Sequence, residues 1–580
     1  MPSSNTGSSH RGSNFLQVVD FRSVNPALEK LAHVAVTKAH NVKVLADAGI
    51  IAPMRPDKLA GMGVALLRWG PTPAGGYTAS AARRPDNVAI IDELGTLTFA
   101  QVHRRTNALA NALSDQGIGE GDNVAIMCRN HRGFVDATVA LSKLGANALY
   151  LNTMFAKPQI TDVCKREKPK AIIFDHEFEN LVEEAGKRRK RFVAWFDGEE
   201  GRPDDPLLED LVQSGSPADL SPPAEKGRVV ILTSGTTGTP KGAQRSQPKS
   251  LDPAAALFSK IPLRSEEHTH IAAPMFHSWG FAHFLLGMTL GSTIVLRRKF
   301  DPESALSAIA QHECTALAVV PVMLQRMLEL PPETIDRYDV SCLRVIAASG
   351  SALPGELAIK VMDRFGDVLY NLYGSTEVAW ATIATPEDLR AAPGTAGRPP
   401  RGTVVKLYDD QGKPVKAGDT GRIFVGNEML FEGYTGGGGK DQIDGLMATG
   451  DVGHFDDGGH LFVDGRDDEM IVSGGENVFP REVEDLLADH EAIDEAAVIG
   501  VEDEKFGQRL KAFVVTNKDV SEDDLKKYVK DNLASYKVPR EFVFLDELPR
   551  NATGKVLKRE LKEDGEGDEA EAGDKAKAES

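Results

Sequence analysis

Apolar and polar positions along this chain alternate between two periods, one typical of strands and one typical of helices. From about Ala79 onward, short apolar runs predict buried strands, and each lies near a stretch with helical spacing. Amphipathic helices are predicted at Leu97–Leu113 and Gly133–Leu144. Strands are predicted at Val124–Cys128, Ala171–Phe174, Phe192–Phe196, Thr315–Val320, Leu343–Ala347 and Val368–Leu372. This alternation predicts an α/β fold of layered helices and sheets.

The pattern changes at both ends of this α/β region. Before it, Pro26–Ala48 and Pro56–Trp69 have helical spacing, and Pro71–Gly76 is interpreted as a linker. After Gly465-Arg466 the chain becomes more charged and predicts a compact βαβ-like unit. We therefore divide the chain into an N-terminal extension (1–76), a large domain (77–466), a small C-terminal domain (467–562) and an acidic, disordered tail (563–580).

The stretch Pro56–Trp69 predicts a short amphipathic helix. Its face is formed by Leu59, Met62, Leu66 and Trp69, with the basic side chains off this face. Such a stripe predicts a helix that docks onto the core of its own protein. The alternative is peripheral contact with a membrane surface through residues 56–69.

Composition narrows the classes of protein. The formal net charge of −18 and the pI near 5.3 argue against a nucleic-acid partner. The four cysteines are widely spaced and form neither a metal motif nor a disulfide framework, which fits a cytoplasmic protein. The longest apolar stretch, Phe281–Leu296, is broken by glycines and polar residues and predicts a helix, a turn and a strand rather than a membrane span. The N-terminus lacks the apolar core of a signal peptide.

The segment Ile231–Gly242, ILTSGTTGTPKG, follows a predicted buried strand at Val229–Leu232. Hydroxyl residues alternate with glycines, so that N–H and O–H groups can point at one anion, and Lys241 adds a cation. The segment differs from a Walker A loop because Pro240 precedes the lysine and no hydroxyl follows it to bind Mg²⁺. A metal ligand must therefore come from elsewhere in the chain.

Two later motifs carry groups suited to a nucleotide. In NLYGSTE, Tyr373 offers an aromatic face, Thr376 a hydroxyl, and Glu377 the hard oxygen ligand that the phosphate-binding segment lacks. In TGD, the carboxylate of Asp451 can accept hydrogen bonds from ribose hydroxyls. Together with the phosphate-binding segment, these motifs offer groups suited to the phosphates, sugar and base of a nucleotide and to a divalent cation; the resemblance described next implies that these are ATP and Mg²⁺.

These motifs resemble those of the adenylate-forming superfamily, which includes acyl-CoA synthetases, luciferases and peptide-synthetase adenylation domains. The resemblance runs in family order from about Ala79 to Leu561, and its further motifs are APMFHSWG, ASGSALP, GRDDEMIVSGGENVFPREVE and PRNATGK. It implies an α/β fold class with a large N-terminal domain of layered α/β subdomains with mixed sheets, plus a small, mobile C-terminal α+β domain.

The resemblance implies roles for individual residues. The implied catalytic residues are Lys241, His277, Thr376, Glu377 and Lys555, and Glu377 is also the implied metal ligand. The implied ATP and AMP site comprises Thr233, Ser234, Gly235, Thr236, Thr237, Gly238, Lys241, Ser349, Gly350, Ser351, Asn371, Tyr373, Gly374, Thr376, Asp451, Arg466 and Lys555. CoA is expected at Ser473, Gly474, Gly475 and Tyr536, the acyl pocket at His277, Trp279, Phe281 and Val378, and the hinge at Asp468.

Within the superfamily the chain looks most like a bacterial fatty-acid–CoA ligase. Such an enzyme uses ATP and Mg²⁺ to convert a medium- or long-chain fatty acid to acyl-AMP and pyrophosphate, and then transfers the acyl group to coenzyme A. The alternatives are a fatty acyl-AMP ligase that loads a carrier protein and an aryl-CoA ligase; a luciferase-like oxygenase and a non-catalytic scaffold are less favoured. The pattern around Lys555 is also a site of regulatory lysine acetylation in relatives.

Overall fold

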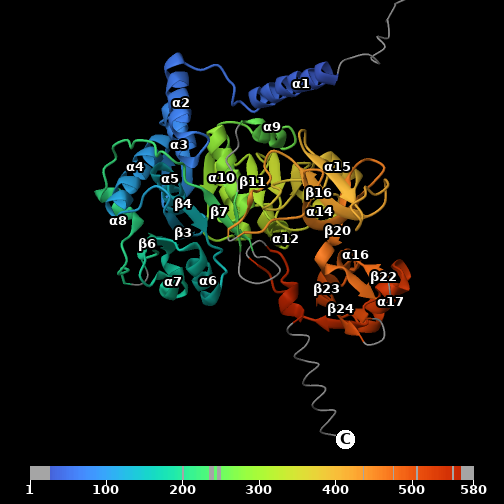
Figure 1. Ribbon diagram of the computed structural model, residues 1–580. Helices are drawn as coiled ribbons and strands as arrows, with labels where there is room; N and C mark the ends of the chain where they lie inside the picture. Colours follow the sequence, from blue (N-terminus) through green and yellow to red (C-terminus); the bar gives the residue numbers. More distant parts are fainter. Residues whose placement is uncertain are drawn as a thin grey trace, which may run out of the picture.

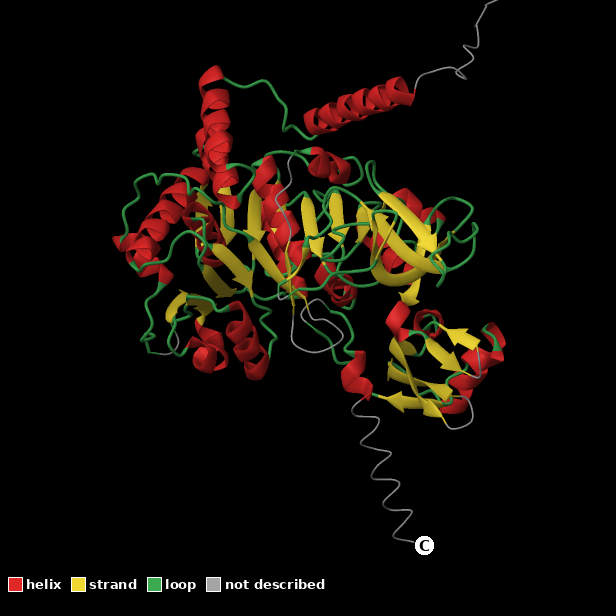
Figure 2. Ribbon diagram, in the orientation of Figure 1, coloured by secondary structure: helices red, strands yellow, loops and turns green. Residues whose placement is uncertain are grey.

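The computed structural model describes residues 26–198, 201–233, 241–244, 250–435, 437–473, 476–503, 507–551 and 554–562. The described strands form three sheets in the larger part of the molecule and a fourth in a small C-terminal part, which lies apart from the rest in Figure 1. Helices cover the sheets of the larger part, as Figure 2 shows. This arrangement confirms the predicted α/β fold with a large mixed-sheet domain and a small C-terminal domain.

The first sheet of the larger part has seven strands in the order β17-β8-β7-β4-β3-β5-β6. Its strands are β3 (Asn123–Met127), β4 (Asn147–Tyr150), β5 (Ala171–Asp175), β6 (Lys190–Trp195), β7 (Val229–Thr233), β8 (Lys241–Gln244) and β17 (Gly433–Tyr434). The strands from β7 to β6 pair in parallel, whereas β8 and β17 are antiparallel. The helices of this region are α4 (Phe99–Asp115), α5 (Arg132–Leu144), α6 (Lys157–Glu167), α7 (Glu179–Gly186) and α8 (Leu208–Ser214), with a short 3-10 helix η2 (His176–Phe178).

The second sheet has eight strands in the order β14-β13-β12-β11-β9-β10-β1-β2. Its strands are β1 (Val88–Asp92), β2 (Gly95–Thr98), β9 (His268–Ile271), β10 (Thr293–Leu296), β11 (Ala316–Val319), β12 (Val345–Ala348), β13 (Leu369–Tyr373) and β14 (Thr382–Ala384). All neighbours pair in parallel except the two edge strands, β2 and β14. The helices are α9 (Asp252–Phe258), α10 (Ser278–Leu290), α11 (Pro302–His312), α12 (Pro321–Leu328), α13 (Pro332–Ile335), α14 (Gly355–Phe365) and α15 (Pro386–Ala391).

The third sheet is antiparallel and leads into the small C-terminal part. It contains β15 (Val404–Tyr408), β16 (Gly421–Gly426), β18 (Gln442–Ile443), β19 (Leu446–Phe455) and β20 (Leu461–Arg466). The small part contains η3 (Asp467–Glu469), β21 (Ile471–Ser473), β22 (Glu476–Val478), α16 (Pro480–Ala488), β23 (Ile493–Asp503), β24 (Gly507–Thr516), α17 (Glu522–Asn532), η4 (Ser535–Lys537) and β25 (Glu541–Phe544). Only β24 and β25 form a parallel βαβ unit, through α17; β23 and β24 form an antiparallel pair, so the βαβ-like prediction is correct only in part.

The N-terminal segment differs from its sequence-based prediction in two ways. Helices α1 (Pro26–Asp47) and α2 (Pro56–Trp69) are present, but the predicted linker Pro71–Gly76 is wrong, because α3 (Pro73–Arg83) begins at Pro73. The predicted boundary at residue 76 therefore cuts a helix. Thr72 caps α3 by accepting a hydrogen bond from the Gly75 backbone at 3.0 Å.

Helix α2 stands above α3 in Figure 1, and only part of its predicted apolar face docks. Trp69 is buried, whereas Leu59 and Leu66 are 54% and 43% exposed. On the opposite side Leu67 is 87% exposed, so apolar side chains extend around much of the helix. Membrane contact through residues 56–69 stays a prediction. Within the described part of the chain, no helix combines the length and apolarity needed to cross a membrane.

Candidate active site

The predicted site residues come together because they follow the carboxyl ends of parallel strands. Ser349 follows β12, and Tyr373 is the last residue of the neighbouring strand β13. His277 lies after β9 in the same sheet, immediately before α10. Since parallel strands end at the same edge of a sheet, their following loops meet there, which is where α/β proteins bind ligands.

These loops line a cavity of about 1670 Å³ that extends between the larger part and the small C-terminal part. This volume exceeds that of a typical pocket for one small ligand. The predicted residues that line it are Lys241, His277, Trp279, Phe281, Ser349, Gly350, Ser351, Asn371, Tyr373, Gly374, Thr376, Glu377, Asp451, Arg466 and Lys555. Most of the predicted site residues that the structure describes therefore share one space.

Several predicted residues cannot be placed. Ser234, Gly235, Thr236, Thr237 and Gly238 lie outside the described residues, as do Gly474 and Gly475. Thr233 ends β7, Ser473 ends β21, and Asp468 lies in η3, so their backbone positions are known. Tyr536 lies in η4 and is 40% exposed, and it is not among the described residues that line the cavity. The roles proposed for these residues stay predictions.

One wall of the cavity carries groups that suit a nucleoside. The Tyr373 hydroxyl donates to Asp451 Oδ2 at 2.6 Å, and Arg466 Nη1 donates to Asp451 Oδ1 at 3.3 Å. Burial, and then the nearby Asp451 carboxylate, raise the pKa of Tyr373 well above its usual value, so the phenol stays a donor. Asn371 Oδ1 is buried and finds no hydrogen-bond partner among the described residues. An amide oxygen of this kind can accept from an exocyclic amino group such as that of adenine.

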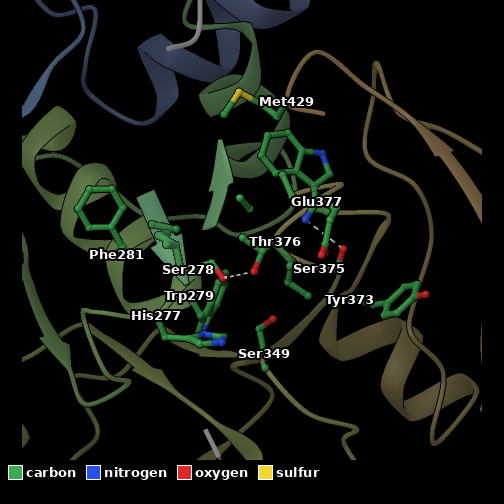
Figure 3. A pocket seen from close by; sticks show the side chains of 18 of the residues that line it. His277, Ser278, Trp279, Phe281, Ser349, Tyr373, Ser375, Thr376, Glu377 and Met429 are labelled. Carbon is green, nitrogen blue, oxygen red and sulfur yellow. Dashed lines mark hydrogen bonds between the residues drawn. The ribbon is translucent and has the colours of Figure 1, made fainter. Parts of the chain in front are cut away.

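The next wall holds the groups expected to contact phosphates and metal. Ser278 Oγ and Thr376 Oγ1 are hydrogen-bonded at 3.1 Å, as Figure 3 shows. The Tyr434 hydroxyl donates to Glu377 Oε1 at 2.7 Å, and Lys241 Nζ lies 5.5 Å from the centre of the Tyr434 ring. Tyr434 thus orients the predicted metal ligand and lies beside the predicted phosphate-binding lysine. The carboxylate of Glu377 lines the cavity and is the type of ligand that Mg²⁺ prefers.

Two further residues of this wall, Tyr434 and Ser278, are not among those predicted from the sequence. Tyr434 lies in β17, which pairs with β8, the strand that begins at Lys241 of the phosphate-binding segment, and Tyr434 lies opposite Ala243. Nothing near it in the sequence indicates a ligand, because this pairing joins segments far apart in the chain. Ser278 follows the predicted His277 directly, so its position after APMFH was the available signal.

The apolar part of the cavity begins at His277 and α10. Trp279 is fixed by its indole N–H, which donates to the carbonyls of Val319 and Ala347 at 3.1 and 3.3 Å. Trp279 and Phe281 both line the cavity, as predicted for the acyl pocket. Val378 does not. It is fully buried in a cluster with Ala381, Ala396, Leu407 and Phe431, because the chain turns after Glu377 and directs this side chain into the core.

Lys555 reaches the cavity from the small C-terminal part. Its backbone N–H donates to Asn551 Oδ1 at 2.9 Å, and Arg550 is ion-paired with Glu495 at 2.9 Å. Gly554 has a φ of +77°, and a Cβ there would lie 2.3 Å from Cγ1 of Val322 in α12. The glycine therefore lets the turn that carries Lys555 contact the larger part of the molecule closely. This contact places Lys555 on the same cavity as Glu377 and Lys241.

Comparison with known proteins identifies the family. The sequence profile of the AMP-binding enzyme family matches residues 77–435, and that of the AMP-binding enzyme C-terminal domain matches residues 482–555. The chain belongs to the AMP-binding enzyme family. The predicted membership in the adenylate-forming superfamily is thereby confirmed, whereas a likeness to fatty-acid–CoA ligases in particular is not shown.

The relatives of this AMP-binding enzyme have similar sequence identities to it. A 2-succinylbenzoate–CoA ligase of Bacillus licheniformis is 32% identical over 82% of this chain and 97% of the relative. A fatty acid–[acyl-carrier-protein] ligase of Streptomyces coeruleorubidus is 29% identical over 84% of this chain and 96% of the relative. Several other relatives are named for aromatic acids. The solved structure of O-succinylbenzoate coenzyme A synthetase from Bacillus subtilis with ATP and magnesium ion has a TM-score of 0.73 and 29% identity, covering 84% of this chain and 99% of that one.

Buried histidines make the stability of this AMP-binding enzyme depend on pH. Burial lowers the pKa of His270 and of His283 to about 4. Neither ring nitrogen of His283 has a hydrogen-bond partner among the described residues. The unfolded chain, with a histidine pKa near 6.5, binds more protons than the folded chain between about pH 4 and pH 6.5. The contribution of these neutral rings to the free energy of unfolding is therefore fully present above pH 6.5 and is lost as the pH falls toward 4.

We predict that His283→Leu flattens the dependence of stability on pH. The change removes a buried polar ring that has no hydrogen-bond partner among the described residues, and with it a slope of about 1 kcal/mol per pH unit between the two pKa values. Chemical denaturation at several pH values between 4.5 and 8 measures the free energy of unfolding. The variant should lose less stability than the wild type on acidification. A decline parallel to that of the wild type would show that His283 does not carry this effect.

Proposed function

We propose that this protein is an ATP-dependent acid–thiol ligase that forms an acyl adenylate and then transfers the acyl group to coenzyme A. The observation that carries this proposal is the convergence of Lys241, Glu377 and Lys555 on one cavity whose other wall carries Asp451 and Asn371. The cavity thus offers polar groups to a nucleotide, cations to phosphates and a carboxylate, and a carboxylate ligand to a metal ion. Membership in the family, and a relative's structure in complex with ATP and magnesium ion, support the same function.

In the first step an oxygen of the carboxylate bonds to the α-phosphorus of ATP while the bond to pyrophosphate breaks. The task of the protein is to position the two anions and to neutralise the charge that develops. We assign the reacting carboxylate and α-phosphate to Lys555, the pyrophosphate side to Lys241 and Thr376, and the ribose to Asp451. Mg²⁺ held by Glu377 would neutralise phosphate charge.

In the second step the thiol sulfur, which has given up its proton to solvent, bonds to the acyl carbon while the bond between that carbon and the AMP oxygen breaks, and AMP leaves. The protein needs no nucleophile of its own for this step, because the acyl adenylate already carries a good leaving group. We propose that Asp468 is the hinge about which the small C-terminal part turns, so that Ser473, Gly474 and Gly475 approach the thiol path. Tyr536 is proposed to contact CoA from the same part of the chain.

For the acid itself, the relatives favour the aryl-CoA ligase alternative over the fatty-acid interpretation, since most are named for aromatic acids. One relative is named as a fatty acid–[acyl-carrier-protein] ligase, and it supports the alternatives of a fatty-acid substrate and of a carrier protein as the acyl acceptor. The apolar side chains of Trp279, Phe281 and Met429 on the cavity wall support an apolar acid of either kind.

The test is product analysis with purified protein, ATP, Mg²⁺ and a panel of aromatic and aliphatic acids. Each acid is offered with coenzyme A or with a phosphopantetheinylated carrier protein, and products are identified by mass spectrometry. We expect acyl-CoA and AMP in equal amounts with at least one apolar acid. Acyl-AMP that is released or passed only to the carrier protein would favour the carrier-loading alternative, and no acid-dependent AMP would contradict the proposal.

A further inference from the structure

The apolar part of the cavity follows helix α10 over most of its length. The lining residues Ser278, Phe281, Ala282, Leu285, Leu286 and Thr289 recur every three or four positions and so lie along one side of the helix. At 1.5 Å per residue, the stretch from Ser278 to Thr289 spans about 16 Å. The first residue of this stretch, Ser278, is hydrogen-bonded to Thr376, so this end of α10 lies at the expected reaction centre. The cavity is therefore a channel that leads away from the expected reaction centre.

The far end of this channel is lined by the N-terminal segment, which precedes the family match at residue 77. Ile50 and Ile51 line it from the connection between α1 and α2, and Met62 and Leu66 line it from α2. The relatives match the chain only over about 82–84% of its length. This part of the wall consequently comes from a segment that the family profile does not include.

Packing against α3 fixes the position of α2. Trp69 is buried, and a Cβ at Gly61 would lie 3.3 Å from Cβ of Ala82. At the corner between the helices, a Cβ at Gly75 would lie 2.0 Å from the Gly70 carbonyl oxygen, so the two helices join at very close range. Met62, nearly two turns after the start of α2, is half-buried and faces the channel from this anchored helix.

The chemistry of the far end suits a hydrocarbon group. Its polar groups include Arg83, Glu225 and Lys226. Arg83 is engaged in part, because its Nη2 lies 3.5 Å from the Glu266 carboxylate and donates to the Gly49 carbonyl at 3.4 Å, whereas its buried Nε has no hydrogen-bond partner among the described residues. The aliphatic side chains of Ile50, Ile51, Met62 and Leu66 are the apolar contacts that the far end offers to a substrate.

We propose that residues 50–66 form the distal wall of the acyl channel and that Met62 sets the length of the acid that binds. The substrate class is an extended apolar carboxylic acid, longer than a single aromatic ring. Since each C–C bond of about 1.5 Å advances an extended zigzag chain by about 1.3 Å, a chain crossing about 16 Å has about 13 carbons. This inference rests on the proposed function, because it takes the carboxylate to lie at the Ser278 end.

The experiment compares Met62→Trp with Leu67→Trp on the same helix. Leu67 is 87% exposed and is not among the described lining residues, so it controls for adding an indole to α2. Filling the channel at Met62 should lower kcat/KM for dodecanoate about tenfold or more and leave hexanoate and benzoate within about twofold. Leu67→Trp should change none of the three. Met62→Ala should shift the preference toward acids longer than dodecanoate.

Calorimetric binding of dodecanoate and hexanoate without ATP separates this inference from the proposed function. If no acid supports adenylation but Met62→Trp selectively weakens dodecanoate binding, the proposed function is wrong, whereas the assignment of residues 50–66 to the distal wall of the channel is supported. If Met62→Trp weakens both acids equally, or neither, the wall assignment is wrong. A thermal melt checks that each variant is folded. If Met62→Trp is unfolded, the chain-length preference of Met62→Ala tests the proposal instead. An unchanged length preference in Met62→Ala contradicts the proposal.

Discussion

Lys555→Ala is expected to lower the rate of acyl-AMP formation from acid and ATP by about 100- to 1000-fold, because it removes a cation from the developing negative charge. The structure places this side chain on the shared cavity through the turn at Gly554, which contacts Val322 of α12. The same variant, supplied with synthetic acyl-AMP and coenzyme A, should form thioester at close to the wild-type rate. Quenched-flow assays of the two half-reactions measure both rates separately.

Lys562→Ala is the matched control, since Lys562 is an exposed lysine seven positions further along and is not among the described lining residues. It should leave both half-reactions unchanged.

Asp468→Pro should slow mainly the second half-reaction, because proline fixes φ at the proposed hinge. Equal losses in both half-reactions of Lys555→Ala would contradict a small domain that serves the two steps in different positions.

Glu377→Ala is expected to lower Mg²⁺-dependent adenylation by about 100-fold or more while the melting temperature stays close to that of the wild type. The reason is chemical, because the phosphate-binding segment has no hydroxyl after Lys241 to serve as a ligand. Tyr434→Phe removes the hydrogen bond to Glu377 and should weaken activation by Mg²⁺ about 10- to 100-fold. Magnesium titrations of the adenylation rate measure both variants.

Glu428→Ala provides the control for these titrations, since Glu428 is an exposed carboxylate not among the described lining residues. Its activation by Mg²⁺ should match that of the wild type. If Glu377→Ala retained wild-type activation, the metal would be held by another group, and the role of Tyr434 would lose its basis.

Local sequence patterns predict much of the scaffold because the buried strands are read from continuous apolar runs. The predicted strand Leu343–Ala347 corresponds to β12 at Val345–Ala348, and Gly133–Leu144 corresponds to α5 at Arg132–Leu144. The site residues Ser349, Tyr373 and Glu377 could be found because each follows such a strand within a continuous motif. Their convergence follows from the parallel order of the strands.

Features that depend on distant contacts could not be predicted. Tyr434 reaches Glu377 only because β17 pairs with β8, and no local pattern indicates that pairing. Val378 adjoins Glu377, which lines the cavity, but it points into the core, since the backbone turns at Ala379, which has a φ of +62°. The linker predicted at Pro71–Gly76 reflects its prolines and glycines, whereas Thr72 and Pro73 in fact begin α3.

The nature of the acid was the least predictable property. In our proposal motif residues hold the nucleotide and the reacting carboxylate, whereas the rest of the acid contacts helix faces such as α10 and α2 that come together only in the fold. The predicted fatty-acid specificity is not supported by the relatives, most of which are named for aromatic acids. Chain length depends on side chains such as Met62, which lies outside every motif.

The most direct test of the account is acid-dependent exchange between ATP and labelled pyrophosphate in the absence of coenzyme A. This exchange reports reversible formation of an acyl adenylate and nothing later in the reaction. The account predicts exchange that requires Mg²⁺ and an apolar acid, that is lost in Lys555→Ala, and that continues at the wild-type rate in Lys562→Ala. Acid-independent exchange, or none with any acid of the panel while the protein is folded, would contradict it.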